Sequence, residues 1–128
     1  MWSYDGIERS IASVAISDGL LYTSDLAGKV HCLDAKTGKV QWMHETNNET
    51  WSTPLVADGK VYVCTKSKLI TFATGREKKL LSEVQLGSSA YATPIVANGT
   101  LYVCSQSYLW AVQKGARPMN VTSTAGTR

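Results

Sequence analysis

The 128-residue sequence is poor in several features that mark common protein classes. It contains a single Phe beside six Tyr and four Trp. Aromatic residues with a polar group suit half-exposed sheet surfaces better than a dry helical core. No apolar run approaches the length of a membrane-spanning segment, so we expect no membrane span. The N-terminus shows no basic stretch followed by an apolar run, so no signal peptide is visible.

The net charge and the spacing of the cysteines point to no particular ligand. The net charge is only +3, and the densest charged run, residues 76–79, contains its own acid and is typical of a solvated turn. We therefore expect no nucleic-acid partner. None of the three cysteines belongs to a CxxC pair, which argues against a zinc cage, and they are too sparse for a disulfide scaffold. They are Cys32, Cys64 and Cys104.

What the sequence does contain is a unit of forty residues that occurs three times. An alternating apolar stretch, an Asp-Gly or Asn-Gly pair and a second apolar stretch ending on Tyr occupy residues 13–22, 53–62 and 93–102. Such a pair between apolar runs predicts a β-hairpin with a type I′ turn, because both turn residues need positive φ. The glycines of the three pairs lie 40 positions apart, at Gly19, Gly59 and Gly99.

Each unit also predicts strands beyond its hairpin, and no stretch has a helical period. Four short antiparallel strands every forty residues are typical of a β-propeller blade. A β-sandwich also consists of short strands, but it does not require one hairpin to recur at constant spacing. We therefore predict an all-β fold, a β-propeller segment of about three four-stranded antiparallel blades, open rather than closed. The additional strands are expected at 29–33, 39–44, 68–72, 79–86 and 108–112.

The stretch DAKTGKVQW connects the third and fourth strands of the first unit. Asp34 can accept hydrogen bonds from the turn backbone, Gly38 can supply positive φ, and Trp42 is expected to wedge between neighbouring blades. With Thr37, these residues match the pattern A-x-D-x-x-T-G-x-x-x-W, with Cys32 where the pattern usually has Ala. They resemble the tryptophan-docking repeat of pyrroloquinoline-quinone-type (PQQ-like) propellers, in particular the BamB-like branch.

This resemblance implies a periplasmic or secreted, non-catalytic scaffold that binds a protein or peptide. The alternative is a piece of a quinoprotein, a PQQ-dependent oxidoreductase, whose catalytic residues lie in missing blades. Such enzymes are expected to hold PQQ and calcium with adjacent cysteines and acidic or Asn ligands. This sequence has no adjacent cysteines and no carboxylate cluster. We therefore predict no cofactor for this chain and assign PQQ and calcium only to a longer parent protein.

The first residues occupy the same register as a later outer strand, because residues 2–5 lie 40 positions before residues 42–45. Three blades cannot close a ring. We therefore interpret the chain as a carboxy-terminal fragment whose partners include the remaining blades. The alternative is a homodimer, with two copies joined head to tail. The expected boundaries are an outer strand of a preceding blade at 1–6, blade one at 10–46, blade two at 50–87, incomplete blade three at 90–114 and a disordered tail at 115–128.

The candidate binding residues are few. Trp51 and Tyr91 are repeat-equivalent and begin inner strands at the end of the ring where propellers usually bind ligands, so they form a candidate binding rim. The alternative is that both side chains pack between blades. In the second unit Ser82 replaces the docking tryptophan.

We predict no catalytic residue and no metal site. His31 and His44 are expected to be structural or exposed. Cys64 and Cys104 end equivalent strands, which favours buried thiols over a disulfide between adjacent blades. For Cys32, the sequence offers neither the base nor the oxyanion site that a nucleophile needs. The nearest pattern to a hard-cation site is one loop with two acids and two amides, Glu45, Asn47, Asn48 and Glu49.

Overall fold

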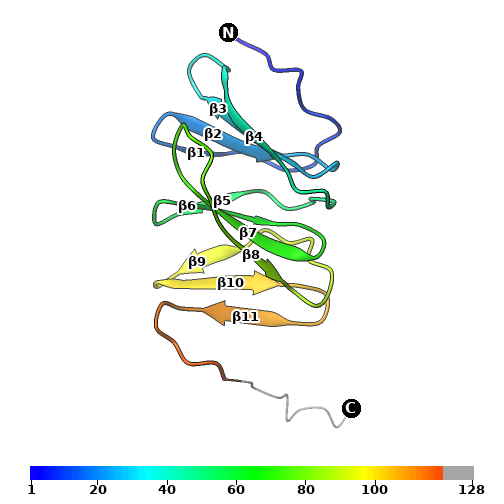
Figure 1. Ribbon diagram of the computed structural model, residues 1–128, viewed down its shortest axis with the longest axis vertical. Coiled ribbons are helices and arrows are strands. Elements are labelled where there is room, and N and C mark those ends of the chain that lie inside the picture. The colour runs from blue at the N-terminus through cyan, green and yellow to red at the C-terminus, as the bar shows by residue number, and fades with distance from the viewer. Residues whose placement is uncertain (120–128) are drawn as a thin grey trace.

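The computed structural model describes residues 1–119, which contain eleven β-strands and no helix. The strands form three antiparallel sheets of four, four and three strands, stacked along the long axis of the molecule (Figure 1). Blade one contains β1 (Ala15–Ser17), β2 (Leu20–Ser24), β3 (Lys29–Asp34) and β4 (Val40–Glu45); blade two contains β5 (Leu55–Ala57), β6 (Lys60–Cys64), β7 (Lys68–Ala73) and β8 (Leu80–Gln85); blade three contains β9 (Ile95–Ala97), β10 (Thr100–Cys104) and β11 (Leu109–Val112).

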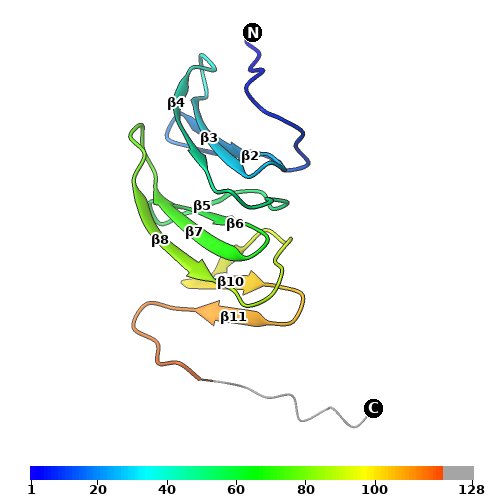
Figure 2. The ribbon, with the colours of Figure 1, turned by 45° about the vertical axis from the view of Figure 1, so that its right-hand side comes forward.

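The prediction of an open propeller segment is confirmed. Within each blade the strands pair in sequence order, and none of the three sheets closes on itself. The outer strands β4 and β8 lie on the same side of the stack (Figure 2). Blade three ends at β11 without an outer strand in the described residues.

The three inner hairpins adopt the backbone that their turn residues predict. The non-glycine turn residues Asp18, Asp58 and Asn98 have φ of 48°, 51° and 51°. The glycines that follow them also have positive φ. Two consecutive residues with positive φ define a type I′ turn, whose twist matches that of the strands it joins. This turn is therefore the local reason why the same hairpin recurs in each blade.

The pairing of the outer strand shifts register at equivalent places in blades one and two. The pairing of β3 with β4 shifts register between Cys32 and Leu33, and that of β7 with β8 shifts between Thr71 and Phe72. A β-bulge of this kind increases the local twist and redirects side chains. In blade one the bulge adjoins Trp42, which pairs with Cys32.

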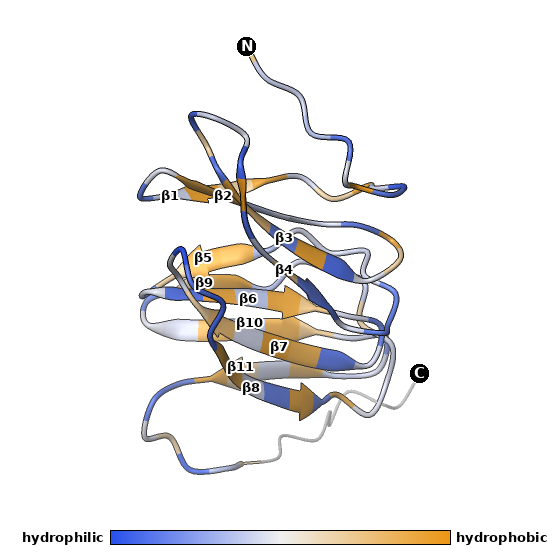
Figure 3. Cartoon of the chain, turned by 45° about the horizontal axis from the view of Figure 1, so that its top comes forward, coloured by the Kyte–Doolittle hydropathy of each residue, from blue (hydrophilic) through white to orange (hydrophobic). Residues whose placement is uncertain are grey.

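An apolar core joins blade one to blade two. Trp42 is only 7% exposed and lies between the rings of Tyr22 and Phe72, with centroids 6.1 and 5.1 Å away. A second cluster joins blade two to blade three. Figure 3 shows the corresponding hydrophobic colour along many of the stacked strands. The first core contains Leu20, Tyr22, Val30, Cys32, Trp42, Val61, Val63, Ile70 and Phe72. The second contains Cys64, Leu69, Leu86, Ala90, Leu101 and Val103.

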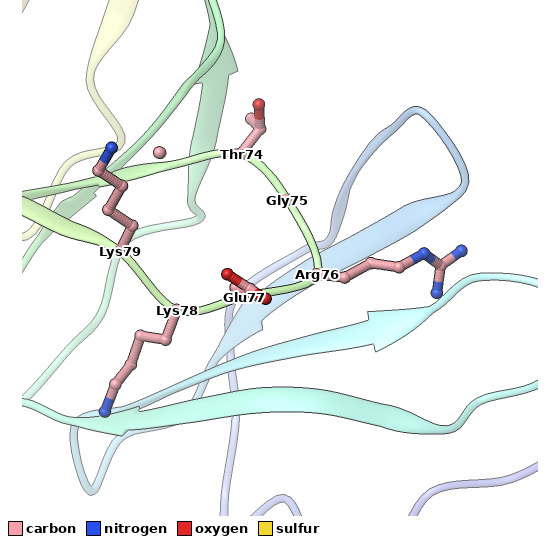
Figure 4. A pocket seen from close by; sticks show the side chains of 7 residues that line it. Thr74, Gly75, Arg76, Glu77, Lys78 and Lys79 are labelled. Carbon is pink, nitrogen blue, oxygen red and sulfur yellow. The ribbon is translucent and has the colours of Figure 1, made fainter.

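The turn between β7 and β8 is held against blade one by hydrogen bonds. The Trp42 indole N–H donates to the Gly75 carbonyl oxygen at 2.9 Å, and the Gly75 N–H donates to the Tyr22 hydroxyl oxygen at 3.0 Å. Arg76 donates to Asp34 at 3.0 Å and to Gln41 at 3.1 Å. Figure 4 shows Arg76 reaching from this turn over the strands of blade one. Side chains of blade one therefore hold this turn in place, in addition to forming part of the apolar core.

The N-terminal segment, residues 1–14, contains no strand. Its side chains nevertheless dock on blade one. The Trp2 indole N–H donates to the Ala35 carbonyl oxygen at 3.2 Å, and the Tyr4 hydroxyl lies 3.1 Å from Nδ1 of His31. The assignment of residues 1–6 to a preceding blade stays a prediction. Residues 115–119 of the expected tail contain no strand, and the rest of that tail lies outside the described residues.

Candidate binding rim at the loop end

One end of the stack is built from loops that are bonded back onto their own blades. In each blade, an N–H of the loop between the second and third strands donates to a carbonyl of the segment before the inner strand. The three bonds measure 2.8, 2.7 and 2.8 Å and are themselves 40 residues apart. They hold the loops and the beginnings of the inner strands at a common end. The pairs are Leu26 with Arg9, Lys66 with Glu49, and Gln106 with Ser89.

Trp51 and Tyr91 meet at this end. Their rings are in edge-to-face contact, with centroids 5.6 Å apart and planes at 75°. Trp51 is 43% exposed and Tyr91 is 39% exposed. The two side chains therefore contact each other across blades two and three while a large part of each ring faces solvent. Ile11, which is also exposed, lies at the equivalent position of blade one.

The backbone beside these aromatic residues is tied between blades. The Ser13 N–H donates to Oγ1 of Thr53, and the Thr53 N–H donates to Oγ1 of Thr93, each at 2.9 Å. Because the donor and acceptor are 40 residues apart in both bonds, they link equivalent positions of adjacent blades. The rim residues are thus carried on segments whose spacing is fixed by the stack.

A polar hollow of about 340 Å³ lies at the loop end between blades two and three. Asn48 donates through Nδ2 to Oγ of Ser67 at 2.9 Å, and its Oδ1 is buried without a hydrogen-bond partner in the described part of the chain. The hollow is lined by Asn48, Lys66, Ser67, Gln85, Gly87, Ser88 and Ser89.

A second hollow, of about 410 Å³, follows the β7–β8 turn and is the one drawn in Figure 4. Two of its basic side chains are engaged with blade one, since Arg76 bonds Asp34 and Lys78 donates to the Met43 carbonyl oxygen at 3.5 Å. We therefore regard it as part of the contact between blades one and two.

Sequence reasoning missed a buried polar chain in blade one. His31 Nε2 lies 2.9 Å from Oδ2 of Asp25, and the side chains are 1% and 0% exposed. An ionised carboxylate only accepts hydrogen bonds, so Nε2 carries the proton and donates. The Tyr4 hydroxyl bonds the other ring nitrogen. The available signal was a contrast between repeats, because blade two has Thr65 and Ile70 where blade one has this Asp and His.

The surroundings of Asp25 keep it ionised. Burial by itself would raise the pKa of Asp25, but hydrogen bonds from His31 and from the backbone N–H groups of Lys29 and Glu8 outweigh burial and lower it. Burial, followed by the nearby charges of Asp25 and Asp5, raises the pKa of Tyr4. The side chains of Tyr4, His31 and Asp25 bond to one another and to nearby backbone groups. This hydrogen-bond network therefore stabilises blade one and holds the N-terminal segment.

The cysteines are all free, and they differ in exposure. Cys32 and Cys64 are buried, and burial raises the pKa of their thiols to about 11 and about 12. Cys104 is exposed, unlike the buried thiol expected for it, because no further blade covers blade three in the described residues. A disulfide between Cys64 and Cys104 is therefore absent.

We expect native thiol titration with Ellman's reagent to modify Cys104 rapidly and to leave the other two thiols unmodified. A raised pKa and burial both suppress the thiolate that reacts. In denaturant all three cysteines should react. Rapid native reaction in a Cys104→Ser variant would contradict the assignment of Cys32 and Cys64 to the cores.

The described residues do not fit the expected quinone and calcium site. The cysteines lie on β3, β6 and β10 of three different blades, and so none are adjacent. Residues 1–119 bring together no group of three His, Cys, Asp or Glu side chains suited to a metal. In the acidic loop that we considered for a hard cation, Glu49 pairs with Lys66 at 3.7 Å and Asn48 bonds Ser67. None of the elements in this part of the chain is a helix with the length and apolarity needed to cross a membrane.

Repeated four-stranded sheets, an outer-strand tryptophan inserted between blades and loops gathered at one end define a PQQ-like β-propeller segment. A family model described as Outer membrane protein assembly factor BamB matches residues 1–124, and the chain belongs to this family. A search of curated proteins found no match.

The fold is shared with solved propellers at low sequence identity. BamB from Moraxella catarrhalis is 20% identical with a TM-score of 0.67, and the match covers 80% of this chain and 33% of that one. Quinohemoprotein alcohol dehydrogenase ADHIIG from Pseudomonas putida HK5 is 22% identical (TM-score 0.65; 77% and 16% covered). The quinohemoprotein alcohol dehydrogenase from Comamonas testosteroni is 20% identical (TM-score 0.64; 74% and 17% covered). The chain thus spans a third or less of each solved structure.

Proposed function

We propose that this chain is a non-catalytic part of a β-propeller scaffold that binds a protein or peptide at the loop end. The observation that carries the proposal is the exposed edge-to-face pair of Trp51 and Tyr91. Large aromatic residues with few rotamers are enriched among the residues that dominate binding energy. The inter-blade bonds at Thr53 and Thr93 hold the pair in place before a partner arrives, which lowers the cost of ordering.

The polar hollow at the same loop end suits a peptide ligand. Lys66 and Ser67, which line the hollow, offer donors to the carbonyl oxygens of a peptide backbone. An apolar side chain of the same ligand would rest on the rings of Trp51 and Tyr91. Membership in a family described as an outer membrane protein assembly factor supports a protein partner and a periplasmic or secreted location.

A peptide selection tests the rim directly. Peptides selected from a random phage-displayed library against the full chain should quench tryptophan fluorescence with saturable dependence. Trp51→Ala and Tyr91→Ala should each weaken binding by about ten-fold or more. Leu81→Ala, which removes an exposed apolar side chain on outer strand β8, should leave binding unchanged. An equal loss of peptide affinity in Leu81→Ala would place the binding surface elsewhere. So would peptides whose affinity is unchanged by both aromatic substitutions.

The quinohemoprotein dehydrogenases among the structural neighbours favour a second candidate, an oxidoreductase piece that contributes to a cofactor site. We expect titration of the chain with PQQ and calcium to give no saturable absorbance or fluorescence change, because the described residues supply neither adjacent cysteines nor a metal-ligand group. Saturable binding at micromolar PQQ that calcium removal abolishes would favour the oxidoreductase over the scaffold.

A further inference from the structure

Blade three presents a sheet edge that no strand of residues 1–119 pairs with. Its strand order is β9, β10 and β11, so within this range β11 has a neighbour on one side only. The Ser105 N–H donates to the Tyr108 carbonyl oxygen, and hydrogen-bonded pairs alternate along an antiparallel ladder. By this alternation Trp110 and Val112 bond to β10, and Leu109 and Ala111 direct their N–H groups to the open edge. The face of the blade is also uncovered, with Ile95 57% and Leu109 69% exposed.

The N-terminal segment already occupies an outer-strand position, but on the opposite end of the stack. Trp42 bonds the carbonyl of Gly75 in the third-to-fourth strand turn of the next blade. Trp2 bonds the carbonyl of Ala35 in the corresponding turn of blade one, and both bonds span 33 residues. Trp2 therefore docks on blade one as Trp42 docks on blade two, while the backbone around it has no sheet partner.

We propose that copies of this chain associate head to tail by sharing a blade. The segment around Trp2–Asp5 of one copy adds to β11 of a second copy as its fourth strand, and blade one of the first packs on blade three of the second. The interface repeats the contact that blades one and two make within the chain. This association is independent of the peptide-binding rim.

The register of the shared blade follows from the repeat. Trp42 pairs with Cys32 and Ser82 pairs with Thr71. The position 40 residues after Thr71 is Ala111, and the position 40 residues before Trp42 is Trp2. Trp2 therefore lies opposite Ala111, and Tyr4 lies opposite Leu109.

The hydrogen bonds of the two edges agree in this register. The Thr46 N–H donates to the Gly28 carbonyl oxygen, so alternation makes Trp42 and His44 the residues of β4 that bond to β3. Their equivalents are Trp2 and Tyr4, which meet the free N–H groups of Ala111 and Leu109. The strand edges that face each other are thus the unsatisfied ones on both sides.

Side-chain contacts of the internal interface also have counterparts. Tyr22 accepts a hydrogen bond from the β7–β8 turn of the next blade. Tyr102 of the second copy stands 80 positions after Tyr22, in the equivalent strand of blade three, so its hydroxyl faces the β3–β4 turn of the first copy. Exposed Ile95 and Leu109 are covered by blade one of that copy, which removes apolar surface from water.

Two blocked variants test strand sharing. The Ala111 N–H points to the open edge, so Ala111→Pro removes it and leaves the hydrogen bonds between β10 and β11 intact. Proline is tolerated at such edge positions. Tyr4→Pro blocks the donated segment. Sedimentation velocity should show wild type self-associating from low to high micromolar concentration and each variant remaining monomeric. Mixing the two variants should give a 1:1 heterodimer, because one intact donor segment then meets one intact edge.

Matched controls distinguish strand sharing from nonspecific aggregation. Ala111→Ser keeps the edge N–H, and Tyr4→Ala loses the ring but keeps the backbone donor, so both should still self-associate. Ser3→Pro should also associate, since by the same alternation its N–H points away from β11. A monomeric wild type at all concentrations overturns the proposal. So does self-association of the proline variants equal to wild type, or a mixture of monomeric variants that forms no heterodimer.

Discussion

Replacing Trp42 by Ala is expected to lower the free energy of unfolding by about 3–5 kcal/mol. The side chain is nearly buried between Tyr22 and Phe72, and its loss leaves a large cavity between two blades. It also removes the donor to the Gly75 carbonyl oxygen, which fixes the β7–β8 turn. Urea unfolding followed by far-ultraviolet circular dichroism measures the change.

Two further substitutions assign this loss to its causes. Trp42→Phe keeps an aromatic ring between the blades but leaves Gly75 without the indole donor, so it should cost about 1–3 kcal/mol. Trp51→Ala removes the same atoms from a side chain that is 43% exposed, and it should cost under about 1 kcal/mol. If Trp51→Ala and Trp42→Ala were equally destabilising, Trp51 would be a core residue and the binding rim would lose its main anchor.

The repeat explains why so much of the fold could be predicted. The Asp-Gly and Asn-Gly turns act over a few residues, and their positive φ follows from the residue types at Asp18, Asp58 and Asn98. The position of Trp42 followed from the turn pattern before it. Each of these features depends on neighbours in sequence or on a constant spacing, which one sequence displays.

The parts that could not be predicted depend on what lies beside each blade. Exposed Cys104 and buried Cys64 occupy equivalent positions, and they differ in that a further blade of the described residues covers Cys64 and none covers Cys104. For Trp51 and Tyr91 the sequence left a binding rim and packing between blades open. The rings contact each other across blades two and three and stay partly exposed, and their role in binding stays a prediction. The pair of Asp25 and His31 was missed because it forms when a loop folds back over its own hairpin.

Breaking that buried pair is the second large effect. Asp25→Ala leaves His31 Nε2 and the backbone N–H groups of Lys29 and Glu8 without their acceptor inside blade one. Leaving a buried donor without its acceptor costs about 1–3 kcal/mol, and Asp25→Ala removes the acceptor of three donors at once. The same urea unfolding experiment at neutral pH measures the loss.

Blade two supplies the matched control. Thr65 and Ile70 stand at the equivalent positions of blade two. The double variant Asp25→Thr/His31→Ile therefore gives blade one the same two residue types as blade two. Replacing a whole buried pair by residues that pack well is often neutral or stabilising. The double variant should therefore be markedly more stable than Asp25→Ala. A double variant as unstable as the single one would mean that the polar chain with Tyr4 is required for the fold of blade one.

The pair should also leave a signature in acid. The folded-state pKa of Asp25 is lowered, so its contribution is complete above the ordinary Asp pKa of about 4 and is lost as pH falls through the folded value. Asp34, whose pKa is lowered to about 2 by the Thr37 N–H and by Arg76, titrates in wild type and double variant alike. Stability should therefore decline less steeply below pH of about 4 in the double variant than in wild type. Parallel declines would show that Asp25 is not held ionised by His31, since the carboxylate would then gain nothing from the fold.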